Sequence, residues 1–335
     1  MELSATRTKN ICRLFEIPPE GEDLIPFFFA EDEIRFLLAV STGEISLPVP
    51  AGKISLSASA VAGGHDAEET AGLDTAEEYR RGLLNKTDET GAFFRLNNFY
   101  GFLDAFCVSQ YEKYQTLPWE KRVLLDQWYF REYLKTLDNG LQPPTSDRVL
   151  PLEEIVEEIL SDPRPVYLNY CDCRSLTGAC GLPRRTCITY KNGINTFVDR
   201  GLSEQIDAER AAEIVRQAEK DGLMHTLAMG GICNCCGDCC YLFRAQEALH
   251  SMGVWPAAEW IIAQDKEKCT GCGKCIDRCH LQVFSKNDTI EGKRSVTADP
   301  SRCAGCGICR STCPTGALKL VKRKESGPDH ELQGI

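Results

Sequence analysis

One cysteine spacing occurs twice near the end of this 335-residue sequence, and it constrains the fold more than any other feature. The first run is CTGCGKCIDRC, from Cys269 to Cys279, and the second is CAGCGICRSTC, from Cys303 to Cys313. In each C-x2-C-x2-C-x3-C run, a short loop with small residues can wrap three thiolates around three irons of a cubane [4Fe-4S] cluster. Structural zinc uses cysteine pairs with a longer spacer, and disulfides need an oxidising compartment. The two runs therefore predict iron–sulfur clusters.

Together with the TGAL sequence that follows the second run, these runs resemble the bacterial-type two-cluster [4Fe-4S] ferredoxin module. In that family the fourth cysteine of each run binds the other cluster. The resemblance therefore implies two ligand sets, which are Cys269, Cys272, Cys275 and Cys313 for one cluster, and Cys303, Cys306, Cys309 and Cys279 for the second. His280 follows the first run where Pro314 follows the second, so the local turns are expected to differ.

The composition predicts where such a chain works. Its start has no apolar stretch of signal-peptide type, and no run reaches the roughly 18 apolar residues of a membrane span. We expect a cytoplasmic protein without a membrane span, in an anaerobic or strongly reducing cytosol, where nineteen cysteines stay reduced. The net charge of −11 argues against nucleic acid as a partner. Residues 265–325 are instead basic, and basic residues offset the negative charge of clusters.

The sequence predicts an α+β fold class with five segments of different character. These are a winged-helix-like N-terminal domain (1–97), a helical connector (98–147), a cysteine-rich metal-binding domain (148–262), a two-cluster ferredoxin domain (263–324) and a flexible tail (325–335).

The N-terminal prediction depends on helical spacing over 30–39 and 75–84, followed by a strand over 91–96. Residues 55–64 are rich in Ser, Ala and Gly and indicate a loop or an insertion. A winged helix suggests DNA binding, but residues 31–92 carry twelve acidic and five basic side chains. This charge favours a docking or dimerisation role.

The connector is expected to contain two amphipathic helices broken at Pro118, and then a linker over 141–147. Cys12 and Cys107 stand alone, which is typical of small buried residues. The cysteine-rich domain is expected to contain three regular elements, which are a helix over 152–160, a strand over 166–170 and a helix over 207–221 with Asp207 as its cap.

Nine further cysteines lie within seventy residues of the middle segment: Cys171, Cys173, Cys180, Cys187, Cys233, Cys235, Cys236, Cys239 and Cys240. Thiolates at this density repel one another unless a metal neutralises them, and adjacent cysteines do not bridge easily. Nine ligands are enough for two four-cysteine sites or for one larger cluster. One or two further iron–sulfur clusters, zinc, and a cysteine redox relay are the interpretations left open.

The order CxCR, two more cysteines, a helix ending in GLMH and then ICNCC resembles a poorly characterised group of iron–sulfur proteins from anaerobes. Those proteins end in the same two-cluster ferredoxin, so the resemblance concerns architecture more than reaction. Arg174 and His225 occupy matching positions and are candidate catalytic residues. Arg174 could stabilise thiolates or an anionic substrate, or bond backbone carbonyls. His225 could ligate iron, relay a proton, or serve as a hydrogen-bonded structural residue.

These features predict low-potential electron transfer from the C-terminal clusters to the middle cysteine site. Whether the chain is an enzyme stays open: an iron–sulfur oxidoreductase with a small-molecule substrate competes with a non-catalytic electron-transfer subunit or adaptor of a larger oxidoreductase. A redox-sensing winged-helix regulator is a weaker alternative. Redox proteins are the expected partners. Nucleotide and flavin motifs are absent from the sequence.

Overall fold

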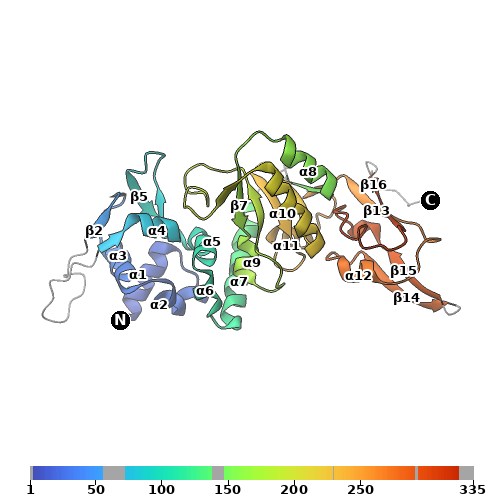
Figure 1. Ribbon diagram of the computed structural model, residues 1–335. Coiled ribbons are helices and arrows are strands. Elements are labelled where there is room, and N and C mark those ends of the chain that lie inside the picture. Colours follow the sequence, from blue (N-terminus) through green and yellow to red (C-terminus); the bar gives the residue numbers. More distant parts are fainter. Residues whose placement is uncertain (1–2, 56–71, 138–146, 229, 291–292, 324–335) are drawn as a thin grey trace. The chain divides into compact units, whose positions relative to one another are not determined.

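The computed structural model describes residues 3–55, 72–137, 147–228, 230–290 and 293–323. Helices and strands are mixed along the chain, which confirms the α+β content (Figure 1). The chain divides into two compact units. Unit 1 comprises Met1–Thr136, Ser175–Thr177 and Lys191–Glu204, and unit 2 comprises Leu137–Arg174, Gly178–Tyr190 and Gln205–Ile335.

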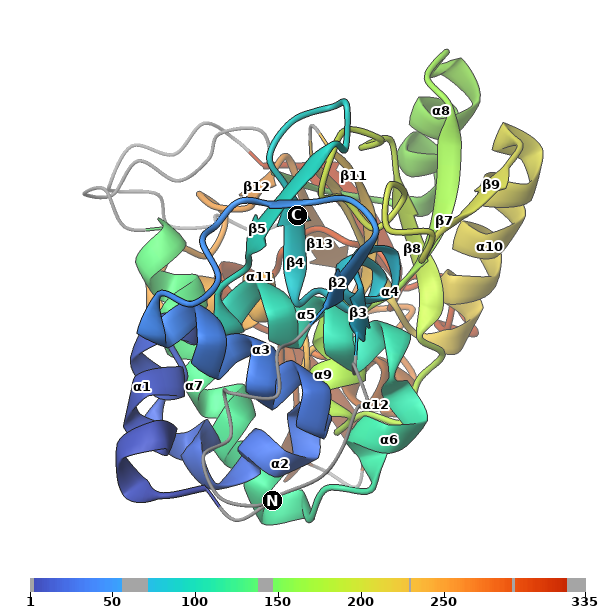
Figure 2. The same cartoon turned by 90° about the vertical axis from the view of Figure 1, so that its left-hand side faces the viewer.

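Unit 1 begins with helices packed around an aromatic core. Phe28 makes edge-on contacts with Phe99, Phe102 and Phe106, and all four side chains are fully buried. Figure 2 shows the N-terminal helices, and α1 packs against α3. The helices of this region are α1 (Ala5–Phe15), the 3-10 helix η1 (Pro19–Leu24), α2 (Ile25–Phe28), α3 (Glu31–Thr42) and α4 (Thr75–Arg81).

Short strands lie between α3 and α4 and after α4. A three-stranded antiparallel sheet has the order β1 (Val49–Pro50), β5 (Phe93–Leu96), β4 (Leu84–Lys86), and β2 (Lys53–Ser55) pairs with β3 (Gly72–Asp74). The helices expected over 30–39 and 75–84 correspond to α3 and α4. Helix α4 ends earlier than expected because Gly82 adopts a left-handed conformation. The winged-helix assignment stays a prediction, and the expected loop over 55–64 lies, after Ser55, outside the described residues.

The connector differs from its prediction. Over residues 98–137 it forms three helices, α5 (Phe99–Ser109), α6 (Tyr111–Gln115) and α7 (Trp119–Leu137). The expected break at Pro118 is present. A second break occurs at Gln110, whose backbone leaves the helical region at φ −121° and ψ 37°. No proline or glycine marks this position, so the sequence pattern missed it. Most of the expected linker over 141–147 lies outside the described part of the chain.

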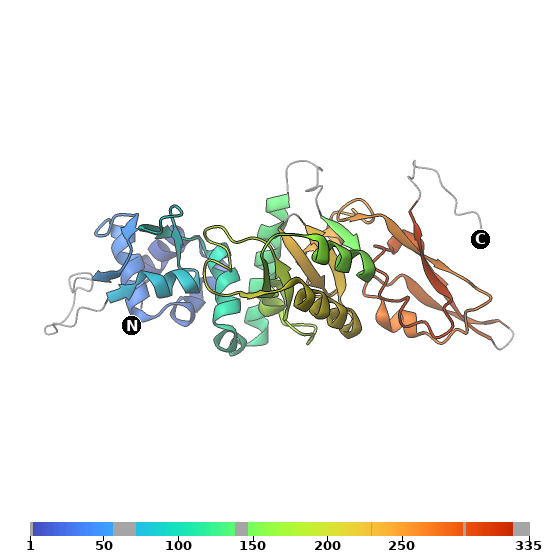
Figure 3. The same cartoon turned by 45° about the horizontal axis from the view of Figure 1, so that its top comes forward.

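Unit 2 contains a seven-stranded sheet, in which β6, β10, β11, β8 and β7 pair antiparallel in that order and β12 pairs with β6 in parallel. Helices α8 (Leu152–Ser161) and α10 (Ala208–Asp221) lie side by side and bury Ile155, Ile159 and Val215 against it (Figure 3). The strand order is β12 (Ala257–Ala258), β6 (Arg148–Leu150), β10 (Met224–Ala228), β11 (Gly231–Cys235), β8 (Arg185–Thr189), β7 (Val166–Tyr170), β9 (Glu204–Ile206).

Three predicted elements of this region are confirmed. Strand β7 has the expected bounds, and α8 extends the expected helix by one residue. Asp207 caps α10 by accepting a hydrogen bond from the Arg210 amide at 2.7 Å, and Gly222 ends the helix with φ 100°.

The C-terminal part of unit 2 contains two antiparallel strand pairs. Strand β13 (Trp260–Gln264) pairs with β16 (Leu318–Lys322), and β14 (Phe284–Ile290) pairs with β15 (Lys293–Ala298). The short helix α12 (Lys274–Arg278) and the 3-10 helix η3 (Pro300–Arg302) accompany the two cysteine runs. Within the described residues, no helix has both the length and the apolar character needed to cross a membrane.

Candidate metal centres

The ferredoxin-like part contains two hollows lined by cysteines, and each cysteine run contributes to both. The first hollow has a volume of about 340 Å³ and the second hollow of about 310 Å³, both including the open space at the mouth. The cysteines around them are Cys269, Cys272, Cys275 and Cys313 in the first, and Cys279, Cys303, Cys306 and Cys309 in the second. The fourth cysteine of each run thus reaches the hollow of the other. This grouping is the one that the ferredoxin resemblance implies, and the ligand sets themselves stay a prediction.

The thiols of the hollows lie in apolar surroundings. Burial raises the pKa of Cys275 to about 11, and it raises the pKa of Cys306 by a larger amount. Backbone amides of Gly305 and Ala317 donate to the sulfurs of Cys303 and Cys313, both at 3.3 Å. Burial disfavours the thiolate and the amides favour it. A bound cation would supply the remaining compensation, so these hollows fit metal clusters better than free thiols.

The sheet and its loops bring the middle cysteines together. Cys171 follows β7 and precedes the short helix α9 (Asp172–Thr177), and Cys187 lies on β8. The pairing of Ile232 with Ile188 places Cys233 of β11 beside Cys187. The other cysteines lie in α9, after α9, on β11, or in the loop that precedes α11 (Tyr241–Ala248). Strand register therefore decides which thiols meet.

Six of the nine thiols form a closed ring in which each lies within hydrogen-bonding reach of two others. The order around the ring is Cys171, Cys173, Cys240, Cys235, Cys233, Cys187 and back to Cys171. Six thiols exceed the four ligands that a single tetrahedral ion takes. The ring therefore suits a polynuclear cluster.

Two ring members are prepared to act as thiolates. Hydrogen bonds from the thiols of Cys171 and Cys233 hold the pKa of Cys187 below its ordinary value, and Arg174 acts in the same direction. Hydrogen bonds from Cys173 and Cys235 likewise lower the pKa of Cys240. The ring also has a solvent-facing side, because Cys233 is exposed while Cys171, Cys187, Cys235 and Cys240 are buried.

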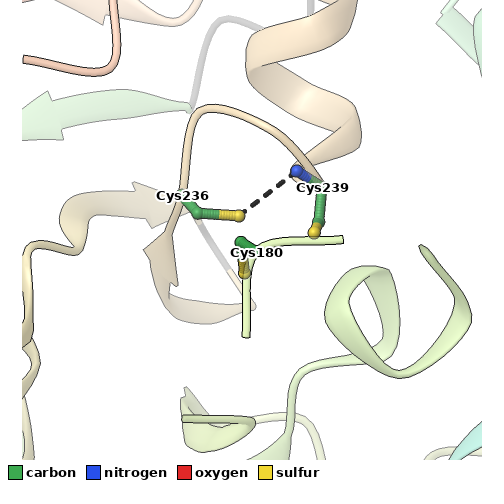
Figure 4. A group of neighbouring side chains, drawn as sticks. All are labelled: Cys180, Cys236 and Cys239. Carbon is green, nitrogen blue, oxygen red and sulfur yellow. Dashed lines mark hydrogen bonds between the residues drawn. The ribbon is translucent and has the colours of Figure 1, made fainter. Parts of the chain in front are cut away.

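The other three middle cysteines, Cys180, Cys236 and Cys239, form a second, compact group that we call the triad. Their sulfur atoms all lie within 4.8 Å of one another. Figure 4 shows the three side chains converging, with the Cys239 amide donating to the Cys236 sulfur at 3.2 Å. Cys236 and Cys239 are fully buried, and Cys180 is half-buried. The nine cysteines thus separate into six and three.

Arg174 is the buried cation of this region, with 2% of its surface exposed. Its Nη1 donates to the Asn234 carbonyl at 2.6 Å, and its Nη2 donates to Thr186 Oγ1 at 2.5 Å. Burial by itself lowers the pKa of the guanidinium, but the neighbouring thiolates of Cys171, Cys187, Cys235 and Cys236 raise it above its ordinary value. The positive charge lies where ring and triad thiolates meet. Both interpretations of Arg174 from the sequence therefore have support, and a catalytic role stays a prediction.

His225 is fully buried on β10, opposite Asn234 of β11. Its Nδ1 lies 2.6 Å from Asn234 Oδ1, and its Nε2 lies 3.7 Å from Glu219 Oε2. Asn234 separates Cys233 from Cys235 and donates to the Thr186 carbonyl. The imidazole therefore orients the strand that carries two ring cysteines. This geometry favours the structural interpretation, and the catalytic one stays a prediction.

The ferredoxin-like part packs directly on the middle part within unit 2. His280 Nε2 lies 2.7 Å from the Gly222 carbonyl, and Arg278 donates to the carbonyls of Glu219 and Lys220. A Cβ atom on Gly237 would come within 2.5 Å of His280 Cβ. Since Gly237 follows Cys236 and His280 follows Cys279, the triad loop touches the chain beside a cysteine of the second hollow.

Sequence reasoning missed several of these residues. Asp172 was overlooked, although one of its carboxylate oxygens lies within 4.8 Å of the sulfurs of Cys171 and Cys173. Its place between two cysteines was the available signal. His280 in place of a proline predicts only a different turn, and nothing in the sequence points to its contact with Gly237.

Comparison with known families agrees with the C-terminal geometry. The family model described as 4Fe-4S dicluster domain matches residues 268–317, the part that carries both cysteine runs. No curated protein and no solved structure gives a significant match to the chain. The C-terminal part is therefore similar to 4Fe-4S dicluster domains, which supports cluster binding and an electron-transfer role.

Proposed function

We propose that this protein transfers electrons from its C-terminal [4Fe-4S] clusters to the cysteine site of its middle domain. The observation that carries the proposal is the packing of His280 on Gly237. This contact brings the second hollow next to the triad loop, and Cys306 of that hollow belongs to the same apolar cluster as Cys235 and Cys240 of the ring, so electrons have a short route through packed protein. The dicluster match supports the donor side of the route.

The acceptor side of the proposal is the six-cysteine ring. Six converging thiolates carry more negative charge than one ion can neutralise, and thiolate ligands select iron–sulfur clusters among few alternatives. The buried guanidinium of Arg174 offsets part of this charge and would raise the potential of a cluster held there. A ring cluster would therefore accept electrons from lower-potential ferredoxin clusters.

An iron–sulfur oxidoreductase is favoured over a purely electron-carrying subunit by one feature of the ring. Cys233 is exposed, so a small substrate or a partner's cofactor could approach the cluster from that side. A redox-sensing regulator that binds DNA is less favoured. Arg81 of α4 forms an ion pair with the buried carboxylate of Glu33, so its charge is already neutralised within the domain.

Anaerobic iron and sulfide analysis with EPR of the reduced full-length protein tests the proposal. We expect more than the roughly eight irons of two cubanes, and we expect Cys187→Ser to lose only the excess. In stopped-flow reduction, Cys306→Ser should slow the reduction of the ring centre. About eight irons in both the wild type and Cys187→Ser would contradict the proposed acceptor.

A further inference from the structure

We propose that the triad of Cys180, Cys236 and Cys239 is a separate centre for one divalent thiophilic ion, best matched by zinc, with one coordination position for an outside thiol or water. This inference deepens the proposed function, because it divides the middle cysteine site into a redox ring and a neighbouring metal centre that does not itself carry electrons.

The spacing of the sulfurs argues for a single ion. Zinc–sulfur bonds of about 2.3 Å at tetrahedral angles place two sulfurs about 3.8 Å apart. The three triad sulfurs lie within 4.8 Å of one another, so one ion can reach all of them with small side-chain movements. The ferredoxin-like thiols show the contrasting arrangement, because each set of four surrounds a hollow.

The loop geometry holds the triad as one unit. Cys236 and Cys239 flank the two-residue turn Gly237-Asp238, and the amide of Cys239 donates to the sulfur of Cys236. C-x2-C is the spacing from which structural zinc sites take two of their ligands. Cys180 comes from a different loop and closes the group from the side (Figure 4).

The number of protein ligands predicts an open position. Among the described residues, the group of potential ligands at this point consists of three cysteines. Four protein ligands are typical of structural zinc sites, whereas catalytic zinc has three and leaves the fourth position to water or substrate. Cys236 and Cys239 are buried and Cys180 is half-buried, so an outside ligand would reach the ion from the side of Cys180. A thiol or a water molecule is the class of ligand that this position would take.

Metal analysis of the anaerobically purified full-length protein tests the inference. We expect about one zinc per chain in the wild type. Cys239→Ser should lose the zinc and keep its iron, whereas Cys187→Ser should lose ring iron and keep the zinc. Cys107→Ser, which changes an isolated cysteine, should keep both metals. The EPR signals of the C-terminal clusters report whether each variant is folded.

Cobalt substitution tests the open position. Cobalt bound to the triad should give a thiolate charge-transfer absorption that is absent from Cys239→Ser, and β-mercaptoethanol should shift it. An absorption insensitive to the thiol would overturn the open position. Loss of about four irons from Cys239→Ser would show that the triad holds a cubane, which overturns the zinc assignment. Zinc found without extra iron would contradict the proposed electron acceptor alone, so the two ideas fail separately.

Discussion

The two cysteine systems use the same ligand atom but are organised differently. In the ferredoxin-like part, each hollow takes three cysteines from one short run and the fourth from the other run. In the middle part, the ring collects its six thiols from strands β8 and β11 and from the starts of α9 and α11. The first arrangement depends on local spacing, whereas the second depends on strand pairing. Damage to the sheet should therefore remove one metal centre and spare the others.

The largest effect is expected from Gly231→Ala. A Cβ atom at this position would approach the Ile188 carbonyl to 2.3 Å, which forces β11 away from β8. Cys233 and Cys187 would separate, and the ring should lose its metal while the C-terminal clusters stay bound. Iron analysis and EPR measure both outcomes. Gly193→Ala is the matched control, because no atom lies within 4 Å of its added Cβ. Ring iron retained in Gly231→Ala would mean that the register does not matter.

Arg174→Met should be the next most damaging change. It removes a buried positive charge from among the thiolates and leaves their negative charge uncompensated, which costs about 3 to 5 kcal/mol for buried pairs. Denaturant unfolding of the reduced holoprotein measures this loss, and the ring potential should fall as well. Arg216→Met, at an exposed position of α10, serves as the control. Equal stability of the two variants would refute the electrostatic role of Arg174.

Gly237→Val should slow electron transfer between the ferredoxin-like part and the middle part more than it disturbs the metal content of either part. The new side chain collides with His280, so the ferredoxin-like part must shift away from the triad loop. Overpacking of this kind costs about 1 to 3 kcal/mol. Both sets of metals should stay bound, and stopped-flow reduction of the ring should become slower. An unchanged rate with a confirmed displacement would place the electron route elsewhere.

Cys107→Ala should have the smallest effect on metal content. Cys107 is fully buried in α5, and its thiol donates to the Asp104 carbonyl at 3.2 Å. We expect a loss of about 1 kcal/mol in stability and no change in iron or zinc. Thermal unfolding and metal analysis check both. Any loss of metal would mean that isolated cysteines also contribute to the centres.

The cysteine runs, the helix α8, the strand β7 and the capped helix α10 could be predicted from the sequence because each depends on neighbours a few residues away. Thiolate spacing, apolar periodicity and an N-cap are local properties. The nine middle cysteines are equally plain in the sequence, but their grouping is not, and no local signal marks the helix break at Gln110. A cysteine count contains no information about which thiols face one another.

The sequence by itself thus determined that the C-terminal part has two ferredoxin-like cysteine runs and that the middle part is rich in cysteine. Only the tertiary structure decided that the nine thiols divide into a ring and a triad, and that His280 joins the triad loop to the second hollow. The physical reason is that the contacts which decide the grouping link residues more than forty positions apart, as Cys187 with Cys233, Cys180 with Cys236 and Gly237 with His280. Strand register and close packing at Gly231 and Gly237 set such contacts, and neither has a local sequence pattern.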